Sequence, residues 1–334
     1  MKKQKKKFKL FDMNRDGKGV YEKENRKPTL KFFFKLLFRK FGQLLRLNVL
    51  MLFQVLPLIV VACIFLLGNK TTLIQNPAFV PLYGIEQISS SPSLLHDLDF
   101  SSFQSELPVH SPVVNVIIIV LFLFLAITWG WQNVGTTYCL RGLFRGDPVF
   151  IFQDYFYAIK RNLKQGFFLG LIDFACSAVL IMDFLYFYFR TGKFGLDVMY
   201  FMIFAIALIY VIMRFYIYHL LITFDLSIFK ILKNALIFSI LGVKRNILAI
   251  LGIVLLLGLH IGLIILLIPI GISIPLILPF VYALAVLAFM GTYAAYPMID
   301  RYMIAPYAQA ETEEPEEAIA PIESEDTITE SETE

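Results

Sequence analysis

Among the ionisable side chains inside apolar stretches of the sequence, three are the candidates for chemistry. Asp173, Arg214 and His260 each stand among hydrophobic neighbours. Inserting a charge at the centre of a membrane helix costs roughly 2.5–3.5 kcal/mol of free energy. Such groups therefore usually pair with one another, bind a substrate or carry a proton. His260 has no acidic neighbour along its helix, which favours a neutral ring bonded to a hydroxyl or carbonyl over a proton relay or a metal ligand.

Asp173 and Arg214 are predicted to lie at the same depth. Asp173 is about seven residues from the inner end of the third apolar stretch, and Arg214 is about eight residues from the inner end of the fourth, so both are roughly 11 Å deep at 1.5 Å per residue. A short loop joins the two stretches as antiparallel neighbours. We therefore predict an ion pair that locks this hairpin, with a substrate or proton-coupling role and no contact as the alternatives. Charge reversal at both positions is then expected to rescue either single reversal.

The sequence offers no pattern of a catalytic or cofactor site. It contains no HExxH, GxSxG or Walker motif, and its histidines share no metal-ligand spacing. We therefore expect no catalytic residue, no cofactor and no metal, and we do not expect an enzyme. A transporter or channel acting on its own should line a path with several polar groups from different helices, and it remains the alternative to a non-catalytic role.

Six apolar stretches, each near the roughly 20 residues that a helix needs to cross a bilayer, must position these side chains. Hydrophobic residues make up 58% of the 334 residues, and they come in blocks rather than in periodic stripes. We predict an all-α membrane protein whose six transmembrane helices form three helical hairpins. The predicted spans are 48–67, 113–134, 167–189, 198–221, 247–268 and 276–298, and the long outer loop is 68–111.

The Lys and Arg residues of the connections predict the orientation. Residues 1–46 carry 16 of the 30, residues 135–165 carry five, and residues 225–246 carry four, whereas the outer loop 68–111 carries one. Basic connections stay in the cytoplasm. We therefore expect a multi-pass protein of a bacterial cytoplasmic membrane with both termini on the cytoplasmic side.

An amphipathic segment precedes each odd-numbered span. Residues 31–46, 147–164 and 225–244 combine bases with Phe, Leu and Ile, a composition typical of cytoplasmic interfacial helices. This pattern predicts three units of interfacial helix plus hairpin, although any membrane protein places bases before inward helix ends. Trp129 and Trp131, at the inner end of the second span, are predicted to be interfacial anchors.

The two ends of the chain carry opposite charge around a transmembrane domain of residues 31–307. Residues 1–30 are predicted to be a basic, flexible arm that contacts anionic lipid headgroups of the bilayer. Residues 308–334 form a tail whose last 26 residues contain 11 acids and no base, a composition typical of disorder. No motif predicts nucleic-acid binding.

Five segments together resemble the YesL-like family of bacterial integral membrane proteins: residues 11–20, 39–48, 135–148, 152–165 and 296–307. Residues 135–148 are the most specific part, because their Gly and Arg residues and their Asp-Pro pair directly precede a predicted amphipathic helix that is rich in aromatic residues. The residues that carry the resemblance in this segment and in that helix are Gly135, Arg141, Arg145, Gly146, Asp147, Pro148, Asp154 and Asn162.

The resemblance implies a role but no defined activity. Members of the family are often associated with carbohydrate uptake, so it implies an accessory or regulatory component whose partner is a carbohydrate-uptake permease. The long outer loop and the acidic tail depart from the family pattern, and nothing is inferred for them from it.

Overall fold

The computed structural model describes residues 28–68, 70–74, 104–108, 111–190 and 192–306. Six of its helices are long and apolar enough to cross a membrane. They correspond one to one with the six predicted spans, which confirms the all-α membrane fold. The helices are α1 (Leu30–Leu67), α3 (Pro112–Arg145), α5 (Leu163–Tyr188), α6 (Phe194–Thr223), α8 (Val243–Leu267) and α9 (Ile274–Ile299).

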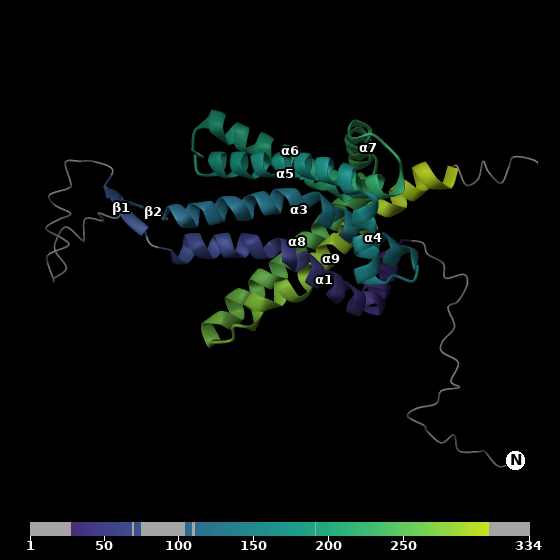
Figure 1. The fold of residues 1–334 in the computed structure, drawn as a ribbon, viewed down its shortest axis with the longest axis horizontal. Coiled ribbons are helices and arrows are strands. Elements are labelled where there is room, and N and C mark those ends of the chain that lie inside the picture. The colour runs from purple at the N-terminus through teal and green to yellow at the C-terminus, as the bar shows by residue number, and fades with distance from the viewer. Residues whose placement is uncertain (1–27, 69, 75–103, 109–110, 191, 307–334) are drawn as a thin grey trace, which may run out of the picture.

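The six helices pack as three hairpins, as predicted. Helices α1 and α3 form the first, α5 and α6 the second, and α8 and α9 the third. Figure 1 shows the first two hairpins running side by side, while the third diverges from them. A 3-10 turn, η3 (Ile268–Ile270), lies between α8 and α9, and a π-helical turn, η4 (Asp300–Ile304), continues α9.

A short β-ribbon closes the base of the long outer loop. Strands β1 (Lys70–Ile74) and β2 (Gln104–Pro108) pair antiparallel, with Lys70 opposite Pro108 and Ile74 opposite Gln104. The ribbon joins the ends of α1 and α3 on the side of the molecule where the α5–α6 and α8–α9 connections also lie (Figure 1). Most of the predicted outer loop lies outside the described residues.

Two of the three predicted interfacial segments are separate helices, and the first is not. Helix α4 (Ile151–Arg161) precedes α5, and α7 (Ile228–Leu241) precedes α8. Residues 31–46 instead continue into the first span as one 38-residue helix, α1. The helical path is interrupted at Asn162 before α5 and at Gly242 before α8, whereas residues 44–50 continue without a break in α1.

The ends of the described chain lie on the same side of the molecule as α4 and α7, opposite the β-ribbon (Figure 1). An even number of spans requires this arrangement. That this side is cytoplasmic stays the prediction from charge, and the basic arm up to residue 27 and the acidic tail lie outside the described residues.

Helices α3 and α9 form the centre of the bundle. Helix α3 packs against α1, α5, α6 and α9, and α9 packs against α1, α3, α6 and α8. Burial is concentrated in the half that adjoins α4 and α7. In α6, for example, the buried residues fall between Tyr216 and Ile222, in its last two turns. The opposite half of each hairpin therefore exposes apolar side chains, as a lipid-facing surface does.

Candidate functional site

A glycine contact brings α3 and α5 together next to the predicted ion pair. A Cβ atom added to Gly130 of α3 would lie 1.9 Å from the Gly166 carbonyl oxygen and 2.7 Å from the Gly170 Cα atom. No side chain fits in that space. Gly166 and Gly170 are four residues apart on one face of α5, which is the small-residue spacing that lets membrane helices approach closely.

Asp173 lies one turn beyond this contact and is buried, with 1% of its surface exposed. The Trp129 indole donates a hydrogen bond to Asp173 Oδ2 over 2.8 Å, and the Tyr218 hydroxyl donates to the same oxygen over 2.7 Å. The Tyr210 hydroxyl donates to Oδ1 over 2.7 Å. We call Trp129, Asp173, Tyr210, Arg214 and Tyr218 the Asp173 cluster.

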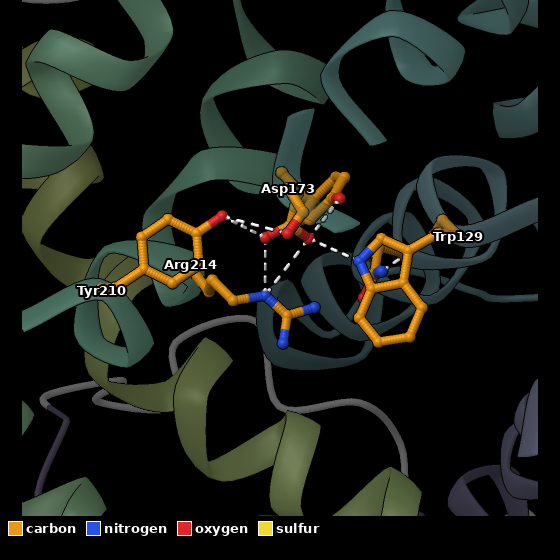
Figure 2. Close-up of polar contacts among 6 residues, drawn as sticks. Trp129, Asp173, Tyr210 and Arg214 are labelled. Carbon is orange, nitrogen blue, oxygen red and sulfur yellow. Dashed lines mark hydrogen bonds and ion pairs between the residues drawn. The ribbon is translucent and has the colours of Figure 1, made fainter. Parts of the chain in front are cut away.

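Arg214 supplies the charge that balances Asp173. Its Nε atom lies 3.0 Å from Asp173 Oδ1 and 3.2 Å from Oδ2, so the predicted ion pair is present. The guanidinium carbon also lies 5.2 Å from the centre of the Trp129 ring, within the range of a cation–π contact. Figure 2 shows the two terminal nitrogens of Arg214 pointing away from the carboxylate.

The cluster is suited to holding three helices together. It joins α3 through Trp129, α5 through Asp173, and α6 through Tyr210, Arg214 and Tyr218. Both carboxylate oxygens already accept hydrogen bonds from protein groups. A carboxylate satisfied in this way offers little capacity for a substrate, whereas a charged group bonded on all sides fixes the geometry of its neighbours.

His260 takes no part in this cluster. It lies on α8, where it is buried and where its Nδ1 atom is 3.3 Å from the Tyr282 hydroxyl of α9. Its Nε2 atom has no hydrogen-bond partner among the described residues. The observed hydroxyl contact is the kind of arrangement that the sequence favours for this residue.

The family-like residues build a corner between α3 and α4. Helix α3 ends at Arg145, and the next residue, Gly146, has a positive φ of 80°, a conformation that glycine adopts without strain. Arg145 and Asp147 pair across this turn at 3.5 Å, both about half exposed. The Phe150 amide donates to the Asp154 carboxylate over 2.8 Å, which caps the start of α4. Pro148 lies in the connection between the two helices.

The same residues fix α4 against the bundle. The Tyr155 ring fills the space beside Gly135, where a Cβ atom would lie 2.6 Å from the ring, and burial raises the pKa of Tyr155. Arg141 donates from Nη1 to the Thr223 hydroxyl over 3.0 Å and to the Ile222 carbonyl over 3.3 Å. Asn162 donates to the Ala158 carbonyl where α4 passes into α5. These contacts hold α3, α4 and the end of α6 in place relative to one another.

An asparagine closely follows a basic residue at or just before the start of each odd-numbered span, as Asn48, Asn162 and Asn246, and these asparagines make different contacts. Asn48 donates to the Phe280 carbonyl over 2.6 Å and accepts from the Ala285 amide over 3.0 Å, so it joins α1 to α9. Asn246 instead accepts from the Tyr216 hydroxyl and donates to the Ser239 carbonyl. The shared sequence pattern therefore does not produce a shared set of contacts, which favours the general placement of bases before inward helix ends over a structural repeat.

Sequence reasoning missed Trp129, Tyr210 and Tyr218 as partners of Asp173. One signal was available, because Tyr210, Arg214 and Tyr218 follow at intervals of four on one face of α6. The interpretation of Trp129 as an interfacial anchor was incomplete, since its indole binds a buried carboxylate. Trp131 donates to the Leu163 carbonyl over 2.9 Å and also serves helix packing.

The described part of the chain contains no group of three or more His, Cys, Asp or Glu side chains that could hold a metal ion. No family model, curated protein or solved structure matches the chain. The fold and the cluster define it as a six-helix integral membrane protein with a polar lock between its first two hairpins.

Proposed function

We propose that this membrane protein is a non-catalytic accessory or regulatory component, and that its partner is a carbohydrate-uptake permease of a bacterial cytoplasmic membrane. The resemblance to YesL-like proteins supplies the carbohydrate link. The hydrogen bonding of Asp173 supports a non-transporting role. Both of its carboxylate oxygens already accept hydrogen bonds, and the donors are Trp129, Tyr210, Arg214 and Tyr218. A transporter needs polar groups that it can offer to its substrate.

The surfaces of α4 and α7 support a docking role. Phe152, Phe156 and Tyr157 of α4 are each more than half exposed, and Phe229 of α7 is 77% exposed. Large aromatic side chains are the residues that anchor protein interfaces. Both helices lie on the side that charge predicts to be cytoplasmic, where a regulatory partner can reach them.

Site-specific photocrosslinking in native membranes tests this role. A photoreactive phenylalanine analogue is placed at Phe156 or at Phe229, and the adducts are identified by mass spectrometry. Phe201 of α6 is the matched control, because it is 65% exposed but lies toward the opposite end of its hairpin. We expect a sugar-uptake permease among the adducts from Phe156 or Phe229 and not from Phe201.

The transporter alternative has a separate test. The purified protein is reconstituted alone in liposomes, and the entry of radiolabelled sugars is followed. Uptake by the protein alone, together with the absence of a permease adduct from both α4 and α7, would overturn the accessory role.

A further inference from the structure

A groove of about 640 Å³ lies between α1 and α8, with α9 as its floor. The divergence of the third hairpin from the first two, visible in Figure 1, separates the walls. Its rim on α8 is formed by Leu251, Leu255 and Leu259, all well exposed. The groove therefore opens sideways, toward the lipid that surrounds the bundle.

The groove is apolar along its length and basic at one end. Arg245 is the one charged side chain among the described residues that line it. In the described part of the chain no carboxylate pairs with Arg245, and its Nη2 atom is 3.5 Å from the Pro28 carbonyl. A cation with no carboxylate partner among the described residues, at the end of an apolar groove, attracts an anion that carries a hydrocarbon chain.

The two hydroxyl groups in the groove are already engaged. Tyr293, near Arg245, donates to the Thr29 carbonyl over 2.6 Å, and Tyr282 contacts His260. A polar solute would therefore find few free partners along these walls, whereas a hydrocarbon chain needs none. This favours a lipid over a sugar or another water-soluble ligand.

The dimensions of the groove fit one leaflet of a bilayer. Arg245 and Leu259 are 14 residues apart on α8, which corresponds to about 21 Å along the helix axis. Half of a hydrocarbon core of about 30 Å is about 15 Å. If Arg245 lies at the level of the headgroups, the groove runs alongside an acyl chain through one leaflet and ends near the bilayer centre.

We propose that this groove is a binding site for one anionic phospholipid, whose phosphate pairs with Arg245 and whose acyl chain lies between α1 and α8. Charge complementarity identifies the headgroup, and the apolar walls identify the chain. The proposal assigns the site to the leaflet that faces the side of α4 and α7, because Arg245 stands at the start of α8.

Native mass spectrometry of the full chain tests the site. The detergent-purified protein is titrated in parallel with phosphatidylglycerol and phosphatidylcholine of identical acyl chains. We expect the wild type to retain one phosphatidylglycerol in preference to phosphatidylcholine. A basic residue near an anionic surface contributes on the order of a fivefold gain in affinity, so Arg245→Gln should reduce the preference by about that factor and Arg245→Lys should restore most of it.

Two matched controls separate the groove from general effects. Lys244→Gln removes the same charge from an exposed neighbour that does not line the groove and should keep the preference. A Cβ atom on Gly252 would meet only Met290, at 3.6 Å, so Gly252→Phe should fold, fill the groove and reduce the retention of both lipids. Gly258→Phe, where the added side chain meets open space, should leave retention unchanged.

Several results would overturn the proposal. Equal lipid preference in the wild type and Arg245→Gln would do so, as would equal retention by the two phenylalanine variants. Competition by inorganic phosphate as effective as that by phosphatidylglycerol would assign Arg245 to a free anion. A dimer that dissociates in Gly252→Phe would assign the groove to a second copy, and lipid binding seen only after removal of residues 1–27 would assign it to the N-terminal arm.

Discussion

Gly170 of α5 lies so close to Gly130 of α3 that a Cβ atom added to Gly170 would come within 2.2 Å of the Gly130 Cα atom. Trp129 precedes Gly130, and Asp173 follows Gly170 by three residues, so the close approach sets the 2.8 Å hydrogen bond between the indole and the carboxylate. The polar lock between the first two hairpins therefore depends on the absence of side chains at the neighbouring glycines.

Substitution of Gly130 by alanine should separate α3 from α5. The added methyl group would clash with the backbone at Gly166, which cannot move without displacing α5. Overpacking of this kind typically lowers the free energy of unfolding by about 1–3 kcal/mol. Thermal unfolding in detergent measures the change, and Gly262→Ala, where a methyl group meets open space, is the control. Equal stability of the two variants would contradict the close packing.

The structure changes the result expected from charge reversal of the ion pair. Sequence alone predicts that Asp173→Arg with Arg214→Asp rescues either single reversal. The structure adds three donors, from Trp129, Tyr210 and Tyr218, that remain directed at position 173. An arginine there would face hydrogen-bond donors, so the double variant should accumulate as poorly as Asp173→Arg. Full recovery in membrane fractions would show that these donors matter little.

Removal of the Tyr218 hydroxyl should weaken the cluster. Hydrogen bonds to charged groups contribute about 1.5–3 kcal/mol, and Tyr218→Phe removes one from Asp173 Oδ2. We expect a loss of that order in the free energy of unfolding, measured by denaturant titration in mixed micelles. Tyr200→Phe is the control on the same helix, because the Tyr200 hydroxyl makes no hydrogen bond to any of the described residues. A loss as large in the control would mean that the effect is not specific to the cluster.

His260 should be replaceable by leucine without loss of stability when Tyr282 is replaced by phenylalanine. The Nε2 atom of His260 is buried without a described partner, and exchange of both members of a polar contact for apolar groups of similar shape is often nearly neutral. Thermal unfolding of His260→Leu/Tyr282→Phe should match that of the wild type within about 1 kcal/mol. Tyr282→Phe alone is the comparison, because it leaves the ring without its hydroxyl partner.

The Asp173–Arg214 pair could be predicted because depth in a membrane helix follows from counting residues. Rise per residue is fixed, and a short connection aligns the two helices of a hairpin. The positions of Trp129 and of Asn48 relative to their partners could not be counted in this way. Trp129 belongs to another hairpin than Asp173, and Asn48 bonds to the backbone of α9, more than 200 residues away along the chain.

The sequence by itself determined the class of protein, the six spans and their pairing into hairpins. These follow from hydropathy and loop length, which act locally along the chain. Only the tertiary structure decided that α1 is continuous, that α3 and α5 meet at glycines, and that α8 stands apart from α1 to leave a basic-ended groove. Lipid tails are as apolar as the side chains that they contact, so hydrophobicity cannot specify which helices pack together or which faces they present to one another. The packing of small and polar residues specifies both.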